Sequence, residues 1–290
     1  MSVAERAPKE RKGIIPGWLK PVRSDSPDGT MALVDHLREL RYRVIMSFLA
    51  FLVIAIVALV IENTTHWLST FAIQPLNEAI DAYKQKYPDQ EVLLTTEGVM
   101  GPFTLQMKIA AVAALIASCP VWMWHLWAFI MPGLLANEKK YALRFLGAAI
   151  PLFLAGVAVG YLVMPKGFAV MLGFNPPGAT NINDMSKYLS FELQMLLVFG
   201  LSFLLPVVLV GLNLMGIVRA RTLSKVRTVA IFACFIFAAL ATPSTDPLSM
   251  LALSAPMAIM YLIAEAICHI NDRRLIASGQ LIELDLDDED

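Results

Sequence analysis

The feature that most constrains this chain is a series of long apolar runs separated by charged or Pro/Gly-rich breaks. A helix that crosses the roughly 30 Å hydrocarbon core of a bilayer needs about 20 predominantly apolar residues. Six runs have about this length: residues 44–61, 103–129, 145–164, 189–214, 228–241 and 248–268. Since 57% of the chain is apolar and only 16% is charged, a soluble domain is excluded. We therefore predict an all-α integral membrane protein with six transmembrane helices.

The positive charges predict the orientation of these helices. Of the 23 Lys and Arg residues, 18 lie before the first run, between the second and third, between the fourth and fifth, or after the sixth. The alternate loops hold only Lys84, Lys86, Lys166 and Lys187, while Lys108 lies inside the second run and is read as an interfacial anchor. Because cytoplasmic loops carry the excess of basic residues, we predict that both termini are cytoplasmic.

The chain divides into three regions by composition. Residues 1–30 contain Pro, Gly, Ser and alternating charges without an apolar period, which predicts a flexible basic arm near anionic lipid. Residues 31–270 form the predicted six-span membrane domain, and residues 271–290 form an acidic cytoplasmic tail. The polar stretch before the first run is too long for the n-region of a signal peptide, so we expect an uncleaved first span.

Prolines and run lengths predict the shape of the bundle. Pro120, Pro151, Pro206 and Pro256 lie within the runs, and proline tends to kink a helix, so we expect bent helices and a concave bundle. The fifth and sixth runs are short, which predicts helices shorter than the bilayer or shielded by partner helices. Between the first two spans, residues 66–83 predict an amphipathic interfacial helix interrupted by Pro75.

Small residues within the runs predict close packing and not chemistry. Gly156 and Gly160 have a spacing that permits close helix contact, which we expect to be internal. Cys119, Cys234 and Cys268 all lie within runs, which argues against disulfides or a zinc site.

No catalytic constellation is recognisable in the sequence. The phosphate-loop pattern GxxxxGK[ST], the nucleophile elbow GxSxG and the zinc helix HExxH are all missing. His125 and His269 lie near the inner ends of two runs and are better read as interfacial polar residues than as haem ligands. We therefore predict a protein that is not an enzyme, has no cofactor or metal and does not bind nucleic acid.

Ionisable residues at membrane depth are costly, so their positions are informative. Glu192 lies a few residues into the fourth run without an obvious partner in its own helix, and we expect it to face protein or a water-filled cavity. Glu265 precedes His269, Arg273 and Arg274 at spacings that permit pairing within the helix. Asp246 begins the last span from the outside.

Two further carboxylates, Glu39 and Glu138, lie among basic residues on the predicted cytoplasmic face. Taken singly, each is explained by a local salt bridge, Glu39 with Arg43 and Glu138 with its neighbouring lysines. Taken together, they could each receive one guanidinium group of the same peptide through a bidentate, charge-assisted contact. The residues alone leave both interpretations open.

Four segments resemble those of a known family. They read HLRELRYR at 36–43, WAFIMPGLLANEKK at 127–140, YLSF at 188–191 and ATPSTDPLSM at 241–250. With the six runs and the predicted orientation, they make residues 31–270 similar to the TatC family, the multispanning core subunits of the twin-arginine protein translocase.

The resemblance implies a receptor for folded preproteins whose signal peptides carry consecutive arginines. It implies that Glu39 and Glu138 take part in twin-arginine recognition and that Arg41, Arg43, Phe129 and Lys140 lie on the same surface. It further implies single-span partners of the TatA and TatB type, an oligomeric complex in the lipids of a bacterial or archaeal cytoplasmic membrane, and transport driven by the proton motive force.

One departure from the family pattern concerns the fourth span. The family commonly has a glutamate two residues before the proline, as in SFEVP, whereas this chain reads SFLLP with Leu204 there. We expect Glu192 or Gln194 to supply the polar group instead, and we place Glu192, Gln194, Asp246, Met250 and Glu265 in the set of intramembrane polar or partner contacts.

Two other functions remain possible from the sequence. A proton-coupled small-molecule transporter would use Glu192 and Glu265 as relay carboxylates, although no inverted repeat is evident. A passive anchor for a membrane complex would need none of the charged residues on the cytoplasmic face. Neither alternative explains the pair of carboxylates on that face.

Overall fold

The computed structural model describes residues 33–278 apart from 89, 91, 97, 131–137, 175–180 and 243–246. For residues 33, 35, 130, 138–144, 181–183 and 248 it describes the backbone only. The predicted basic arm, most of the predicted acidic tail and Asp246 lie outside the described residues.

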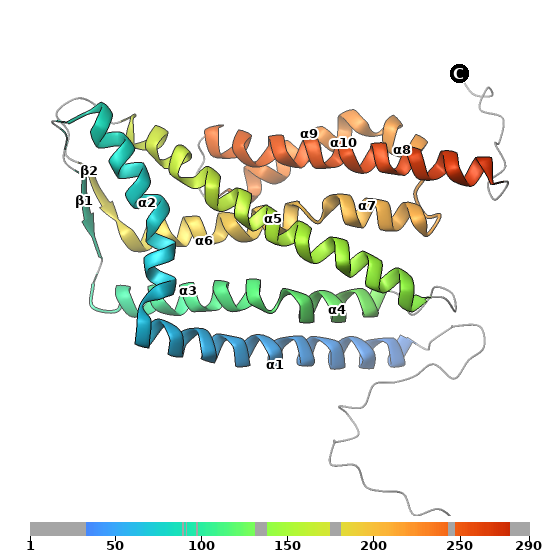
Figure 1. Cartoon of the computed structure of the whole chain (residues 1–290), viewed down its shortest axis with the longest axis horizontal. Coiled ribbons are helices and arrows are strands. Elements are labelled where there is room, and N and C mark those ends of the chain that lie inside the picture. Colours follow the sequence, from blue (N-terminus) through green and yellow to red (C-terminus); the bar gives the residue numbers. More distant parts are fainter. Residues whose placement is uncertain are drawn as a thin grey trace, which may run out of the picture.

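Ten helices and two short strands make up the described chain. In order they are α1 (Leu33–Thr65), α2 (Trp67–Lys86), β1 (Val92–Thr95), α3 (Gly101–Ala117), α4 (Cys119–Ile130), α5 (Glu138–Leu172), β2 (Asn181–Asp184), α6 (Met185–Ser202), α7 (Leu205–Leu214), α8 (Ala220–Lys225), α9 (Arg227–Ala241) and α10 (Pro247–Ala277). Most helices run along the long axis of the molecule, whereas α5 crosses obliquely and α2 lies across one end (Figure 1).

Different helices and strands lie at the two ends of the bundle (Figure 1). At one end, called here the α8 end, α1 and α5 begin, α4 and α7 end, and α8 lies. At the other, called the strand end, β1 pairs with β2 in parallel, with Val92 opposite Asn181 and Thr95 opposite Asp184. The sequence analysis did not predict this strand pair.

Each predicted apolar run falls within a described helix or helix pair. Four segments are long and apolar enough to cross a membrane: His36–Thr65, Phe145–Leu172, Met185–Leu214 and Ser249–Ala277. A fifth candidate is the pair α3 and α4, which is bent by 57°. The apolar helix α9 has only 15 residues, about 22 Å at 1.5 Å per residue. The described chain is thus a helical membrane protein with four or five candidate spans.

The last helix corrects one prediction. We expected a short final span, but α10 has 31 residues and continues through Glu265 to Ala277. The prediction was wrong because it took charged residues as the limit of the helix. Ion pairing with another helix neutralises Glu265, so the helix does not end there.

The prolines act differently from one another. The α3–α4 bend lies beside Pro120, and α6 and α7 are separated by two residues just before Pro206. By contrast, Pro151 lies inside the continuous helix α5 and Pro256 inside α10. Two of the four prolines therefore lie at helix breaks, and the other two lie within continuous helices.

Pro75 does not interrupt α2, contrary to our prediction. Proline has no N–H, so the carbonyl four residues earlier, that of Phe71, loses its helical partner. The Tyr161 hydroxyl of α5 donates to this carbonyl at 3.0 Å, and the Tyr161 and Phe71 rings stack with centroids 4.5 Å apart. A tertiary hydrogen bond thus replaces the missing helical one. The buried face of α2 comprises Ala72, Pro75, Leu76, Ala79, Ile80 and Tyr83.

Glycines allow α5 and α6 to approach closely. A Cβ at Gly156 would lie 2.6 Å from the Phe199 carbonyl oxygen, and one at Gly160 would lie 3.1 Å from the Phe199 Cβ. From the other side, a Cβ at Gly200 would lie 2.8 Å from the Phe153 ring. The prediction that the Gly156 and Gly160 pair serves internal packing is confirmed.

Candidate functional site

Glu39 is the central residue of the predicted receptor surface, and it lies two turns into α1 at the α8 end. Its exposed fraction is only 6%. The Arg43 Nε donates to Glu39 Oε1 at 3.0 Å, and the Arg43 Nη2 donates to the same oxygen. Glu39 Oε2 is buried and has no hydrogen-bond partner in the described part of the chain. The predicted local salt bridge is therefore present, but it uses only one of the two carboxylate oxygens.

Aromatic rings from α4 pack beside this carboxylate-bearing segment of α1. His36 stacks on Phe129 with ring centroids 4.5 Å apart, and Tyr42 meets His125 edge to face at 6.4 Å. These ring pairs join α4 to the first turns of α1, and the assignment of Phe129 to one surface with Glu39 stays a prediction. Arg41 is exposed.

Glu138 is the first residue of α5, and α5 begins at the same end of the bundle as α1 (Figure 1). The backbone of Lys140 lies in the first turn of this helix. The side chains of Glu138 and Lys140 lie outside the described residues, so their contacts stay predictions.

Glu192 lies on α6 and is completely buried. Neither of its carboxyl oxygens has a hydrogen-bond partner of normal geometry among the described residues. The prediction that Glu192 faces protein and not lipid is confirmed. Its position also means that the chain itself covers this carboxyl, so a partner helix cannot reach it in this conformation.

Other residues of the predicted polar set have different surroundings. Gln194 is exposed on α6, and its Nε2 donates to the Ala241 carbonyl at the end of α9 at 3.3 Å. Met250 is half-buried in the first turn of α10. Leu204, which replaces the family glutamate, packs against the cluster that contains Met123 and Phe153.

Glu265 has a partner that the sequence analysis missed. The Arg227 guanidinium at the start of α9 donates to Glu265 through Nε at 3.0 Å and Nη2 at 2.6 Å. The Ser224 hydroxyl donates to the same carboxylate at 2.6 Å, and His269 lies 3.8 Å away. Of the intrahelical partners predicted, only His269 is near Glu265. The carboxylate fixes α8 and α9 to α10.

A second polar network at the α8 end also holds these helices. Asn213 of α7 donates to Asp272 Oδ1 at 2.8 Å, and the Ala220 backbone N–H donates to Asp272 Oδ2 at 2.8 Å. Asn271 donates to Asn213 Oδ1 at 2.9 Å. The charged and amide groups near a predicted membrane boundary could have indicated a polar network. Its partners could not be predicted, because Asn213 and Asp272 lie 59 residues apart in the sequence.

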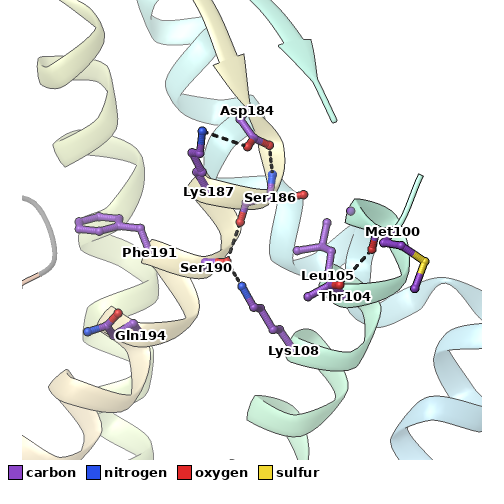
Figure 2. Close-up of a pocket in the computed structure, with 11 residues that line it drawn as sticks. Met100, Thr104, Leu105, Lys108, Asp184, Ser186, Lys187, Ser190, Phe191 and Gln194 are labelled. Carbon is purple, nitrogen blue, oxygen red and sulfur yellow. Dashed lines mark hydrogen bonds and ion pairs between the residues drawn. The ribbon is translucent and has the colours of Figure 1, made fainter. Parts of the chain in front are cut away.

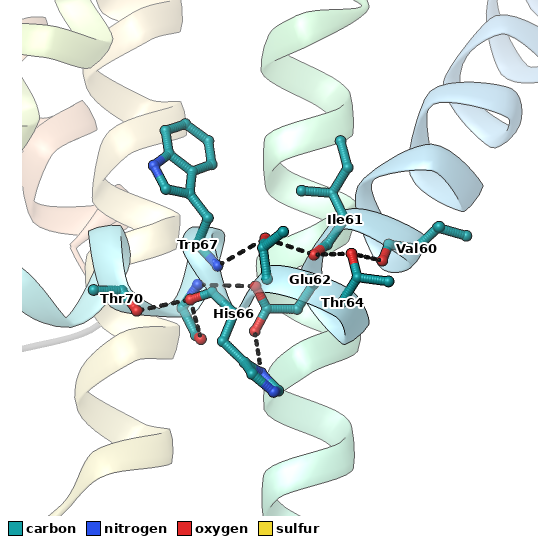
Figure 3. Close-up of polar contacts among 9 residues, drawn as sticks. Val60, Ile61, Glu62, Thr64, His66, Trp67 and Thr70 are labelled. Carbon is teal, nitrogen blue, oxygen red and sulfur yellow. Dashed lines mark hydrogen bonds and ion pairs between the residues drawn. The ribbon is translucent and has the colours of Figure 1, made fainter.

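Glu62 is a buried carboxylate at the opposite end that the sequence analysis did not single out. It is 1% exposed and lies in the last turn of α1 (Figure 3). Its Oε2 accepts the Ser69 backbone N–H at 3.1 Å, one of the N–H groups that the first turn of α2 leaves unpaired. Negative charge is favourable at a helix N-terminus, so Glu62 caps α2 and fixes the corner at His66, which has a positive φ of 52°.

The arrangement does not resemble a catalytic or metal site in the part of the chain that is described. No group of three His, Cys, Asp or Glu side chains there could hold a metal ion. All three cysteines are free and buried, as their place within the apolar runs predicts. At the α8 end, the Glu39 carboxylate has one oxygen without a hydrogen-bond partner among the described residues and lies beside aromatic and basic side chains. Such a site suits the binding of a cationic group.

The fold and this site define a multi-pass helical membrane protein with a charged, non-catalytic surface at one end. A model of the family described as Sec-independent protein translocase protein (TatC) matches residues 35–256. A Sec-independent protein translocase protein TatC of Frankia casuarinae is 39% identical over 269 residues, which cover 91% of this chain and 72% of that protein. A second TatC protein, of Carboxydothermus hydrogenoformans, is 33% identical over 235 residues, which cover 81% of this chain and 91% of that protein.

A solved structure agrees with these relatives. The crystal structure of the twin-arginine translocase receptor TatC in DDM superposes with a TM-score of 0.68 at 28% identity, covering 80% of this chain and 99% of that one. The chain belongs to the TatC family. It is therefore a multi-pass membrane component of twin-arginine protein transport, and this family is not enzymatic.

Proposed function

We propose that this chain is the core receptor subunit of a twin-arginine translocase and that its α8 end binds the signal peptides of folded preproteins. The observation that carries the proposal is the state of Glu39. A carboxylate can accept about four hydrogen bonds, yet both donors of Arg43 converge on Oε1 and Oε2 has none in the described chain. A guanidinium of the peptide would pair with this oxygen through a charge-assisted bond once the side chains that cover the oxygen move aside on binding.

The second arginine is assigned to Glu138. Since α5 begins at Glu138 at the same end of the bundle at which α1 begins, we assign the second carboxylate of the dipeptide site to this residue. Phe129, stacked on His36, offers an aromatic surface of the kind that guanidinium groups contact. Arg41, Arg43 and Lys140 are assigned to the same surface.

The proposal includes a membrane topology and partners. Six spans with α9 as the short fifth one would place both termini and the α8 end in the cytoplasm, in accord with the distribution of Lys and Arg. Single-span subunits of the TatA and TatB type would pack on the membrane face of the bundle near Gln194 and Met250. Transport would draw on the proton motive force.

The alternative of a proton-coupled small-molecule transporter is disfavoured by Glu265. A relay carboxylate needs access to a proton path, but both oxygens of Glu265 are engaged by Arg227 and it is 3% exposed. Its role in the structure is to join helices.

Photocrosslinking tests the receptor assignment. A photoreactive residue at Arg41 or Phe129 should crosslink to a twin-arginine signal peptide and not to the twin-lysine version. Glu39→Gln and Glu138→Gln should each reduce this crosslink roughly 10- to 100-fold, since a charged hydrogen bond is worth about 1.5–3 kcal/mol. Glu78→Gln is the matched control, because Glu78 is exposed on α2 at the strand end. Unchanged crosslinking in both test variants would refute the proposal.

A further inference from the structure

A pocket with both polar and apolar walls lies at the strand end, between the beginnings of α3 and α6 (Figure 2). Its volume is about 630 Å³. Two rows of polar side chains face each other across it: Thr104 and Lys108 of α3, and Ser186, Ser190 and Gln194 of α6. The spacing of four residues in each row places the row on one helix face.

The pocket contains hydrogen-bond donors that are not in use. The Lys108 ammonium donates to the Ser190 hydroxyl at 2.9 Å, and in the described chain this is its one hydrogen bond out of three possible. The Ser190 hydroxyl in turn donates to the Ser186 carbonyl at 2.6 Å. The Ser186 Oγ is buried and has no partner among the described residues. A buried hydroxyl without a partner costs free energy, so the pocket is incomplete as it stands.

The charges of the pocket favour an anion. Lys108 and Lys187 line it, and Asp184 is the one acidic residue that does, at 3.7 Å from the Lys187 ammonium. The lining therefore carries a net charge of about +1, which matches a single phosphodiester. Lysine binds phosphate as a point charge, and hydroxyls complete the coordination of its oxygens.

The depth of the pocket favours a lipid over a free anion. Lys108 lies within the second apolar run, seven residues and about 10 Å beyond the start of α3, where we expect the boundary between headgroups and acyl chains. Beside the polar rows the wall also includes Leu105 and Phe191 (Figure 2). A phospholipid would place its phosphate against Lys108 and its hydrocarbon against the apolar side chains, so it would match both the charged and the apolar side of the pocket.

We propose that this pocket binds an anionic phospholipid of the leaflet at the strand end, with its phosphate on the Lys108 ammonium and on the Ser186 hydroxyl. The site is separate from the peptide surface at the α8 end. A bound lipid would join α3 to α6 where no other described helix covers the gap.

Native mass spectrometry of the delipidated full chain in detergent tests the site. Phosphatidylglycerol should remain bound to the wild type at collision energies that remove phosphatidylcholine. Lys108→Gln should lower phosphatidylglycerol affinity roughly tenfold or more, and Lys108→Arg, which keeps the charge, should retain most of it. Lys84→Gln is the matched control, since Lys84 is exposed in the last turn of α2 and does not line the pocket.

Two results would overturn the proposal. One is equal retention of phosphatidylglycerol by the wild type and by a Lys108→Gln variant that melts at the same temperature as the wild type. The other is displacement of the lipid by millimolar inorganic phosphate, which would identify the site as one for the free anion. If Lys108→Gln fails to fold, the comparison of the wild type with Ser186→Ala, which removes one donor, decides in the same way.

Discussion

The hydrogen bond from Tyr161 to the Phe71 carbonyl makes a sharp test of how α2 tolerates Pro75. Tyr161→Phe removes one hydroxyl and keeps the ring that stacks on Phe71. The carbonyl already lacks a helical donor because residue 75 is proline. We expect a loss of about 1 kcal/mol, the usual net value of one hydrogen bond, or about 2–4 °C in melting temperature for a chain of this size.

The reasoning predicts coupling between two substitutions. Pro75→Ala restores an N–H that can bond to the Phe71 carbonyl within the helix, so the tyrosine hydroxyl is no longer needed. In the Pro75→Ala background, Tyr161→Phe should therefore cost close to nothing, which gives a coupling free energy of about 1 kcal/mol. Pro75→Ala itself changes stability by two opposed effects, higher helix propensity and the loss of a buried ring. Both effects cancel in the double-mutant cycle, because Tyr161→Phe is compared within each background.

Thermal unfolding in detergent with a thiol-reactive dye provides the assay. Cys119, Cys234 and Cys268 are free and buried, so they react with the dye as the chain unfolds. Tyr87→Phe is the control, because the Tyr87 hydroxyl makes no hydrogen bond with a described residue and its loss should be neutral. An equal cost of Tyr161→Phe in both backgrounds would refute the account of α2.

The same assay checks three further predictions. Gly156→Ala should destabilise by about 1–3 kcal/mol through overpacking against the α6 backbone, whereas Gly147→Ala, where an added Cβ meets nothing within 4 Å, should be neutral or slightly stabilising. Arg227→Gln should lower the melting temperature by leaving the buried carboxylate of Glu265 without its cation, and adding Glu265→Gln should recover part of the loss. Glu62→Ala should cost about 1–2 kcal/mol through loss of the α2 cap, and Glu62→Gln, which keeps an acceptor oxygen, should cost less.

The apolar runs were sufficient to predict where the helices lie. Hydrocarbon thickness sets a length scale that a sequence shows directly, so each run coincides with a described helix or helix pair. Close packing at Gly156 and Gly160 was also predictable, because small residues four apart lie on one helix face. These features depend on residues that are near each other in the chain.

Features that depend on distant residues were not predictable from the sequence. Arg227 lies 38 residues from Glu265, so the local partners Arg273 and Arg274 were the natural expectation and were wrong. Tyr161 lies 90 residues from Phe71, so Pro75 was expected to interrupt its helix. Glu62 was overlooked because a glutamate after an apolar run is usually solvated, and only the turn into α2 buries it.

The candidate site was predictable in part. The short spacing of Glu39 and Arg43 made their salt bridge one of two open interpretations, and the structure contains it; Oε2 of Glu39 has no partner among the described residues. The pairing with Glu138 is still a prediction.

The measurement that tests the central claim most directly is a double-mutant cycle between Glu39 and the signal peptide. Dissociation constants would be measured for the wild type and for Glu39→Gln, each with a twin-arginine peptide and with peptides in which one or the other arginine is glutamine. Glu39→Gln should weaken the twin-arginine peptide about 10- to 100-fold and should hardly affect one of the two single-glutamine peptides, the one that lacks its guanidinium partner. Equal weakening of all three peptides would contradict the account.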